Sequence, residues 1–165
     1  MNAIVAVTQN WGIGCKGKLL HSIPADMRHF KSLTEGKIVV MGHETFKSLP
    51  GCRPLSNRLN IVLSANKALT IEGATICNCL NELENFLQTQ NSNDVFVIGG
   101  QAVYEQLLEK CTHAYITKIH TQATADTFFP NIDALPQWQL ENESALEYYE
   151  GVSYRFCTYV QRREE

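Results

Sequence analysis

The sequence lacks the residue patterns that mark metal-binding, disulfide-stabilised, membrane-spanning and nucleic-acid-binding proteins. Its six cysteines include no C-x-x-C pair, and its five histidines show no H-x-x-x-H spacing. We therefore expect no structural metal site, no disulfide framework and reduced thiols. No stretch approaches the roughly 20 apolar residues of a membrane span. Fourteen Lys and Arg residues against 17 Asp and Glu residues give a net charge of −3, which argues against a nucleic-acid partner or an anionic membrane surface.

The amino-terminal residues do not have the pattern of a secretory leader. Residues 1–7 carry no basic segment, and their apolar run is too short for a signal sequence, so we expect a cytoplasmic protein. The chain has 165 residues, of which 44% are hydrophobic, and no repeat, linker or low-complexity segment divides it. This length suffices for one domain with a sizeable core, and we expect residues 1–165 to form that domain.

Short apolar runs alternate with helical patterns along the chain. The apolar runs are typical of strands buried on both faces of a parallel sheet, and they cover residues 3–7, 37–41, 60–63 and 94–98. A helix is predicted from Pro24 to Gly36, and residues 81–88 and 101–108 are further helix candidates.

The last third of the sequence has a different pattern. After a strand at residues 115–119, residues 139–149 and 153–160 predict a hairpin around Glu150-Gly151. Strands that alternate with helices and end in a hairpin predict an α/β fold whose mainly parallel sheet has an antiparallel edge.

A glycine-rich segment follows the first strand and matches the dinucleotide-binding pattern G-x-G-x-x-G. The segment is Gly12-Ile13-Gly14-Cys15-Lys16-Gly17. The dinucleotide pattern also requires a helix to begin there, but residues 18–23 are too few for a helix and a turn before Pro24. The sequence favours a flexible glycine-rich loop, and such a loop beside a strand end can act as an active-site lid.

A second glycine segment lies between the strand at residues 94–98 and the helix candidate at residues 101–108. Gly99 and Gly100 would let the backbone approach a ligand, and the following helix would offer N–H groups to a phosphate. A tight turn that only connects the strand to the helix remains an equal alternative.

Asp26 is the third candidate for chemistry. A carboxylate in the first helical turn can simply complement the helix dipole. However, Asp26, Phe30 and Leu33 are spaced so that they share one helix face, which places the carboxylate toward the core. A carboxylate in that position needs strong partners or has a raised pKa, and either condition makes it a functional candidate.

These features and others along the chain resemble dihydrofolate reductase of the bacterial chromosomal type. The matching segments, in order, are Ile4 and Ala6; Gly12-Ile13-Gly14; Ile23-Pro24-Ala25-Asp26-Met27 with Phe30-Lys31; Val40-Met41-Gly42 with Thr45-Phe46 and Ser48-Leu49; Arg53-Pro54-Leu55; residues 58–64; Val97-Ile98-Gly99-Gly100 with Val103-Tyr104; Tyr115-Ile116-Thr117; and residues 125–130. Their order over nearly the whole chain makes the resemblance specific. It implies a single domain with a mainly parallel eight-stranded central sheet, an antiparallel carboxy-terminal edge strand and four flanking helices.

The resemblance implies reduction of 7,8-dihydrofolate to 5,6,7,8-tetrahydrofolate with NADPH, which carries the hydride. Asp26, supported by Thr117, would bind the amino group and N3 of the pterin and promote protonation of N5 through water. Arg58 would hold the α-carboxylate of the folate glutamate, with Arg53 near the same tail. The implied substrate-binding residues are Ile4, Asp26, Met27, Phe30, Leu49, Arg53, Leu55, Arg58, Ile98 and Thr117, and the implied catalytic residues are Asp26, Thr117, His21 and Leu19.

The resemblance also implies a cofactor site in a monomeric protein. Gly99 and Gly100, joined by a cis peptide, would pack against NADPH, and residues 42–45 would meet its pyrophosphate. Residues 14–20 would close over the nicotinamide, braced by residues 125–126. The implied cofactor-binding residues are Ala6, Ile13, Gly14, Gly17, Lys18, Gly42, His43, Glu44, Thr45, Leu63, Ser64, Ala65, Asn78, Ile98, Gly99, Gly100, Gln101, Ala102, Val103 and Tyr104.

Two departures from the family pattern affect pH dependence and cofactor choice. Leu20-His21 replaces the Pro-Trp pair of the family, whose tryptophan helps to hold an ordered water near the aspartate. His21 either holds the same water and titrates together with Asp26, or points into solvent. His43 replaces a residue that is often basic, and Ala65 and Ala102 replace polar ones, so we expect a narrower preference for NADPH over NADH. The remaining candidates for the 2′-phosphate are Ser64, Asn66, Lys67 and Gln101.

Two other functions remain as alternatives. The pyrimidine reductase of riboflavin synthesis shares this fold, but it would need a ribose-phosphate pocket, and Asp26 and Arg58 match dihydrofolate reductase better. A non-catalytic nucleotide-binding module would bind NADPH without binding dihydrofolate. The lack of clustered ligands disfavours a metal-dependent hydrolase.

Overall fold

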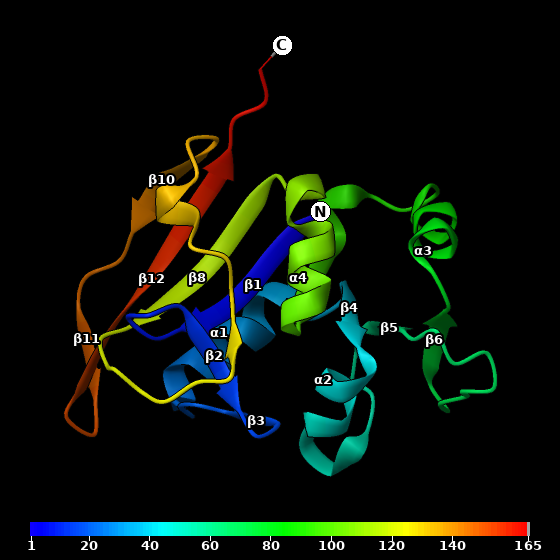
Figure 1. Cartoon of the computed structure of the whole chain (residues 1–165), viewed down its shortest axis with the longest axis horizontal. Coiled ribbons are helices and arrows are strands. Elements are labelled where there is room, and N and C mark those ends of the chain that lie inside the picture. Colours follow the sequence, from blue (N-terminus) through cyan, green and yellow to red (C-terminus); the bar gives the residue numbers. More distant parts are fainter. Residues whose placement is uncertain (165) are drawn as a thin grey trace.

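Alternating strands and helices build a central sheet of nine strands and a separate sheet of three strands in the computed structural model, which describes residues 1–164 (Figure 1). The central sheet has the order β10-β12-β8-β1-β7-β4-β5-β6, and β11 also pairs with β12. Its strands are β1 (Asn2–Val7), β4 (Ile38–Gly42), β5 (Leu59–Leu63), β6 (Ala74–Cys77), β7 (Val95–Gly99), β8 (His113–Ile119), β10 (Trp138–Glu143), β11 (Glu147–Tyr149) and β12 (Val152–Gln161).

The strands from β8 to β6 in this order are parallel, and β12, β10 and β11 are antiparallel at one edge. The helices are α1 (Pro24–Thr34), α2 (His43–Ser48), α3 (Leu80–Leu87) and α4 (Gln101–Leu107). The expected α/β fold is confirmed. Eight strands follow one another in the sheet order, and the short strand β11 pairs with β12 as a ninth. Within residues 1–164, no helix is long and apolar enough to cross a membrane.

The carboxy-terminal hairpin has the expected turn but a different first arm. Glu150 and Gly151 both have positive φ, 48° and 77°, as a two-residue hairpin turn requires. The single strand expected over residues 139–149 is instead two strands, β10 and β11. Between them, the hydroxyl of Ser144, rather than a backbone carbonyl, accepts a hydrogen bond from the amide of Phe156.

A second difference concerns the glycine-rich segment after β1. The segment expected to be a flexible loop forms β2 (Gly12–Cys15) and β3 (Lys18–Leu19), and β2 also pairs with β9 (Thr127–Phe128). Short strands that contain several glycines have little apolar pattern of their own. Their pairing depends on β9, which lies more than one hundred positions along the chain.

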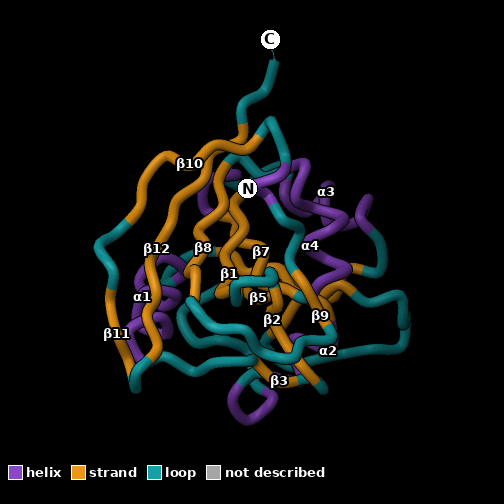
Figure 2. The backbone as a smooth tube through the Cα atoms, turned by 60° about the vertical axis from the view of Figure 1, so that its left-hand side comes forward, coloured by secondary structure: helices purple, strands orange, loops and turns teal. Residues whose placement is uncertain are grey.

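The two faces of the central sheet have cores of different shape. Alternate residues of β4 divide between them: Val40 belongs to one continuous buried cluster with residues of α3 and α4, whereas Val39 and Met41 pack with Phe46 of α2. The α1 side of this second face has its own cluster, which contains Ile23. Figure 2 shows α1 on one side of the strands β8 and β1, with α4 on the other side. The face that carries α1 and α2 therefore has two separate cores rather than one.

Candidate active site

Asp26 lies in the first turn of α1 and contacts β8 on the sheet below. The helix begins at Pro24, whose fixed φ and missing N–H suit the first helical position. Thr117, which is 3% exposed, donates its hydroxyl hydrogen to Oδ1 of Asp26 at 2.6 Å. Oδ2 of Asp26 has no hydrogen bond to any residue from 1 to 164, so this oxygen is available to a ligand.

The environment of Asp26 changes its acidity. Burial raises the pKa of the Asp26 carboxyl above its ordinary value, although the hydroxyl of Thr117 and the nearby His29 both favour the ionised form. A partly buried carboxylate with a raised pKa and a free oxygen is a candidate for binding or proton chemistry.

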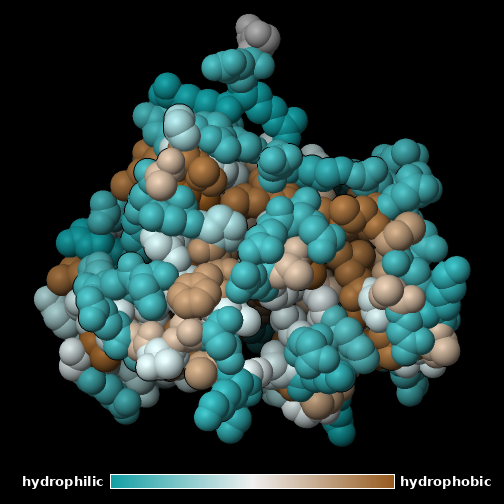
Figure 3. Space-filling view, in the orientation of Figure 1, coloured by the Kyte–Doolittle hydropathy of each residue, from teal (hydrophilic) through white to brown (hydrophobic). Residues whose placement is uncertain are grey.

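The strands of the sheet separate beside this carboxylate. β1 and β7 pair only at Asn2 with Phe96 and Ala3 with Val97, and a bulge interrupts the pairing of β4 with β7. The hydroxyl of Tyr104 donates to the carbonyl oxygen of Ile4 at 2.7 Å, beyond the last pair of β1 with β7. Open α/β sheets bind ligands where their strands separate at the carboxyl ends. Figure 3 shows the surface hollowed between the β2–β3 hairpin and α2.

The glycine pair at the end of β7 keeps the backbone free of side chains at this edge of the sheet. Gly99 and Gly100 are joined by a cis peptide bond, and α4 follows directly. A Cβ at either glycine would lie 3.3 Å from Oγ1 of Thr45, and a Cβ at Gly42 would lie 3.2 Å from Cγ2 of Val103. In the described structure no side chain caps α2 or α4, so the backbone N–H groups at both helix starts can meet an anionic ligand.

The hairpin of β2 and β3 is held beside the cleft by Asp126. Oδ2 of Asp126 accepts a hydrogen bond from the amide of Lys16 at 2.8 Å, and its own amide donates to the carbonyl oxygen of Gly14 at 3.0 Å. Lys16 and Gly17 form the turn, and both have positive φ. Leu19 at the end of the hairpin is 76% exposed. The side chain of Leu19 therefore contacts the rest of the described chain very little.

Arg58 is oriented by the carboxyl-terminal end of α1. Its Nε donates to the carbonyl oxygen of Ser56 and its Nη1 donates to Oγ1 of Thr34, while its guanidinium lies 5.9 Å from the centre of the Phe30 ring. Thr34 is fully buried and was not among the predicted site residues. A threonine in the last turn of a helix gives no signal of this role, because the contact joins positions 24 residues apart.

The other predicted substrate residues divide between partly buried and exposed positions. Leu49 and Leu55 are partly buried against the cluster that contains Phe46 of α2. Met27 is 56% exposed, and Arg53 is also exposed. Leu49 and Leu55 therefore belong to the apolar packing around α2, whereas Met27 and Arg53 lie at the surface.

The side chains of Ser64 and Asn78 and the backbone of Asn66 meet at the carboxyl ends of β5 and β6. The side-chain amide of Asn78 donates to the carbonyl oxygens of Ser64 and Asn66, and the amide of Asn66 donates to Oγ of Ser64. Ala65 and Lys67 are exposed in the same segment. This group contains most of the residues predicted to meet the cofactor 2′-phosphate.

Gln101, the remaining 2′-phosphate candidate, forms hydrogen bonds with β9 and within α4 instead. Its Oε1 accepts a hydrogen bond from the amide of Phe128 in β9, and its Nε2 donates to Glu105. Because β7 and α4 lie two strands away from β5, Gln101 does not join the group around Ser64.

His21 and His29 have different positions relative to Asp26. Nε2 of His21 forms a hydrogen bond of 2.8 Å with the hydroxyl of Thr121, in the loop after β8. The histidine whose charge acts on Asp26 is His29, one turn further along α1. The prediction considered only His21, although the spacing of Asp26 and His29 on one helix was a signal for the second histidine.

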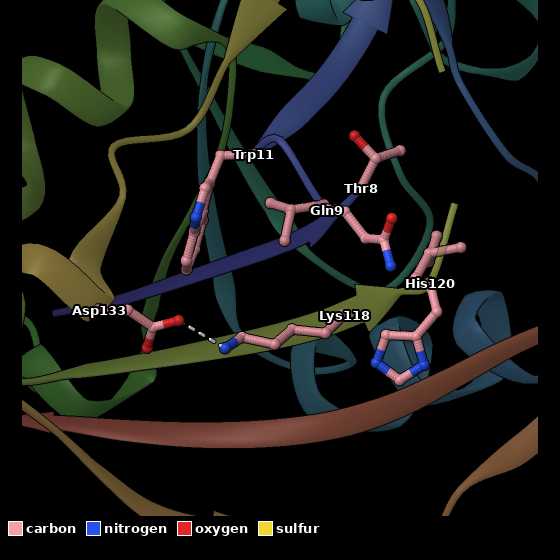
Figure 4. A pocket seen from close by; sticks show the side chains of 8 residues that line it. Thr8, Gln9, Trp11, Lys118, His120 and Asp133 are labelled. Carbon is pink, nitrogen blue, oxygen red and sulfur yellow. Dashed lines mark hydrogen bonds and ion pairs between the residues drawn. The ribbon is translucent and has the colours of Figure 1, made fainter. Parts of the chain in front are cut away.

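A separate cavity of about 240 Å³ lies on the other face of β8. Figure 4 shows Lys118 extending to Asp133 in this cavity, with the ring of Trp11 on the same side. Lys118 follows Thr117 in the strand, so its side chain points away from the face that carries Asp26. This cavity is therefore not part of the Asp26 cleft.

The arrangement belongs to the α/β enzymes that place their ligand cleft at the carboxyl ends of a mainly parallel sheet. Comparison with known proteins identifies the family. Residues 1–163 match the family model described as dihydrofolate reductase, and the chain belongs to the dihydrofolate reductase family.

Individual relatives agree with this assignment. The chain is 32% identical to dihydrofolate reductase of Schistosoma mansoni, with 96% of this chain and 95% of that protein covered. It is 34% identical to the bifunctional dihydrofolate reductase-thymidylate synthase of Glycine max, over 97% of this chain, and it spans only 33% of that longer protein. A solved structure of dihydrofolate reductase from Enterococcus faecalis, complexed with NADP(H) and RAB-propyl, matches with a TM-score of 0.88 and 33% identity, over 98% of this chain and 96% of that one.

Proposed function

We propose that this chain reduces 7,8-dihydrofolate to 5,6,7,8-tetrahydrofolate with NADPH. The observation that carries the proposal is Asp26, a partly buried carboxylate held by Thr117 beside the glycine pair of β7, in a chain of the dihydrofolate reductase family. We propose further that residues 1–165 act as one domain, as a monomer, in the cytoplasm.

The substrate site follows from the hydrogen-bonding atoms that the fold leaves free. Thr117 uses one acceptor site of Asp26 Oδ1, so Oδ2 and the second lone pair of Oδ1 remain to accept from the pterin amino group and N3–H. Nε of Arg58 and one hydrogen of its Nη1 are engaged, so Nη2 and the second hydrogen of Nη1 remain for the α-carboxylate of the glutamate tail. Phe30, Leu49 and Leu55 pack against the rings, with Ile4 and Ile98 contributing at the strand ends. Met27 and Arg53 complete the substrate site from its exposed rim.

The reaction consumes one hydride and one proton and yields tetrahydrofolate and NADP⁺. NADPH supplies the hydride when it is bound, and the protein aligns the two rings. The carboxylate of Asp26 binds the pterin at the ring edge remote from N5, so it promotes protonation of N5 through a water molecule rather than directly. Thr117 keeps the carboxylate in position. Leu19, exposed at the end of the β2–β3 hairpin, closes over the nicotinamide together with residues 14–20, and His21 holds the water near Asp26.

The residues at the carboxyl ends of the strands fit a dinucleotide. Gly42, Gly99 and Gly100 leave the backbone bare, and the uncapped starts of α2 and α4 offer N–H donors to phosphate oxygens. We propose that the remaining cofactor contacts come from three segments. They are residues of β1, β2 and the β2–β3 hairpin (Ala6, Ile13, Gly14, Gly17 and Lys18); of the α2 start (His43, Glu44 and Thr45); and of the strand ends and α4 (Leu63, Ser64, Ala65, Asn78, Ile98, Gln101, Ala102, Val103 and Tyr104).

Preference for NADPH over NADH depends on the group around Ser64. With Gln101 bonded to Phe128, the donors left for a 2′-phosphate are Ser64, Asn66 and Lys67. We expect kcat/KM to be higher for NADPH than for NADH. Equal values for the two cofactors would contradict a dedicated 2′-phosphate site.

The activity is tested by following the loss of NADPH absorbance with dihydrofolate as substrate. We expect turnover that requires both compounds, with tetrahydrofolate as the product. Binding of NADPH without its oxidation would instead favour a nucleotide-binding module. Oxidation only with a ribosylated aminopyrimidine would favour the pyrimidine reductase of riboflavin synthesis.

A further inference from the structure

The strand β9 lies at the edge of the three-stranded sheet, and its two sides have different partners. On the side of β2, the amide of Phe129, directly after β9, donates to the carbonyl oxygen of Trp11 at 2.9 Å. The amide of Phe128 instead donates to Oε1 of Gln101 in α4, at 2.9 Å. A side chain of α4 therefore bonds the backbone of β9 where the described chain places no further strand beside it.

The side-chain amide of Gln101 is fixed at both of its ends. Its Nε2 donates to Oε1 of Glu105, one turn along α4, at 2.9 Å. An ionised carboxylate only accepts hydrogen bonds, so the NH₂ group of Gln101 faces Glu105 and the amide oxygen faces the backbone N–H of Phe128. Both polar atoms of this side chain are thus engaged with the protein.

A second contact docks the same segment on the same face of α4. The ring of Phe129, which is 1% exposed, packs edge-on against Tyr104, with 4.9 Å between ring centres and 74° between planes. Gln101 and Tyr104 are three positions apart, so they share one face of the helix. Figure 2 shows β9 beside β2, on the side of α4. The helix α4 therefore supports β9, and β9 supports β2.

These contacts continue from β9 into the turn of the β2–β3 hairpin. Asp126, directly before β9, accepts from the amide of Lys16 at 2.8 Å and donates to the carbonyl oxygen of Gly14 at 3.0 Å. At the other end of this chain of contacts, Gln101 directly follows the glycine pair of β7. The hairpin is thus joined through β9 to the element that follows this glycine pair.

We propose that Gln101 is a positioning residue for the β2–β3 hairpin, because its side chain fixes β9 and β9 holds the hairpin in place. The consequence for the reaction rests on the proposed function, in which the hairpin closes over the nicotinamide. This role is separate from any contact of Gln101 with the cofactor, since it uses the side-chain amide, whose two polar atoms are bonded to Phe128 and Glu105.

Two sets of substitutions separate this role from a general effect on stability. Gln101→Met keeps the length of the side chain and removes both hydrogen bonds. Gln101→Glu combined with Glu105→Gln exchanges the two groups, so that a carboxylate accepts from the Phe128 amide and a side-chain amide donates to that carboxylate. Gln106→Met, at an exposed position of the same helix, is the matched control.

Hydrogen exchange followed by NMR in the ligand-free protein is the first measurement. The amides of Asp126 and Lys16 do not contact Gln101, but both belong to the chain of contacts that it supports. In Gln101→Met we expect both amides to exchange at least about threefold faster, the effect of losing one hydrogen bond of ordinary strength. The exchanged pair and Gln106→Met should keep the native rates, and exchange within β8 should be the same in every variant.

Hydride transfer in a single turnover, at saturating NADPH, is the second measurement. Gln101→Met should slow this step by at least about threefold, because the hairpin is held less firmly over the cleft. The KM for dihydrofolate depends on Asp26 and Arg58 and should stay at its native value. A general structural defect would change both quantities.

Faster exchange of the Phe128 amide alone, with Asp126 and Lys16 unchanged, would overturn the proposal, because the contact would then be only local. Equal acceleration within β8, or an exchanged pair that exchanges as fast as Gln101→Met, would overturn it as well. Should Gln101→Met fail to fold, the native chain provides the decision. Its Phe128, Asp126 and Lys16 amides should open together, with one free energy of opening and one dependence on denaturant, and separate openings contradict the proposal.

The two measurements also separate this proposal from the proposed function. Hydrogen exchange needs no turnover, so an inactive chain with the expected exchange removes only the proposed function. An active chain in which Gln101→Met leaves the exchange of Lys16 unchanged removes only the role of Gln101.

Discussion

Replacement of Thr117 by valine tests the hydrogen bond that fixes Asp26. The substitution keeps the side-chain shape and removes the hydroxyl that donates to Asp26 Oδ1 at 2.6 Å. A hydrogen bond to a charged group contributes about 1.5–3 kcal/mol to stability. Because Asp26 is only partly buried, we expect the lower part of that range, a loss of about 1.5–2 kcal/mol in the free energy of unfolding at neutral pH.

The loss should depend on pH in a defined direction. Burial raises the pKa of Asp26 in the folded chain, so ionisation of Asp26 opposes folding, and the native chain gains stability as pH falls through that pKa. The hydroxyl of Thr117 offsets part of this cost. The difference between native and Thr117→Val chains should therefore be largest above the pKa of Asp26 and decrease as the carboxyl becomes protonated.

Urea denaturation followed by circular dichroism measures the free energies of unfolding of both chains at pH values above and below the pKa of Asp26. A double-mutant cycle with Asp26→Asn isolates the contribution of the pair. Thr75→Val in β6, at the opposite edge of the sheet from β12, is the matched control and should show no such pH dependence. A coupling energy below about 0.5 kcal/mol, which is the scatter expected for independent sites, or a loss that does not change with pH, would refute the reasoning.

Two further substitutions test the cleft and its hairpin. Tyr104→Phe leaves the buried carbonyl oxygen of Ile4 without its partner and should cost about 1–3 kcal/mol of unfolding free energy by chemical denaturation, whereas an unchanged midpoint would argue against this contact. Asp126→Ala removes the acceptor of the Lys16 amide, so hydrogen exchange of that amide should become faster while exchange within β8 stays the same; unchanged protection of Lys16 would show that Asp126 does not hold the hairpin.

Local sequence signals accounted for the elements that depend on neighbouring residues. Pro24 marked the start of α1, helical spacing placed Asp26 toward the sheet, and Glu150-Gly151 marked the hairpin turn. Each of these features depends on backbone preferences or on helical periodicity within a few residues. The assignment of site residues came from the resemblance to a family, because spacing alone does not distinguish Phe30 or Leu49 from ordinary core residues.

The features that escaped prediction depend on contacts between distant segments. The β2–β3 hairpin is completed by β9, and Gln101 accepts a hydrogen bond from the amide of Phe128 instead of joining the group around Ser64. The bond of His21 with Thr121 joins positions 100 residues apart. The place of His29 beside Phe156 follows from the register of β12 on β8, which no local pattern specifies.

The kinetics of Asp26→Asn test the central claim most directly, because this substitution keeps the size of the side chain and removes its charge. With NADPH and dihydrofolate, we predict that kcat/KM at neutral pH falls by at least about 100-fold, the contribution typical of a positioned proton-transfer group. Activity should partly recover in acid, where the substrate arrives already protonated. A loss of less than about tenfold, equal to 1.4 kcal/mol, or the absence of any recovery in acid, would contradict the account.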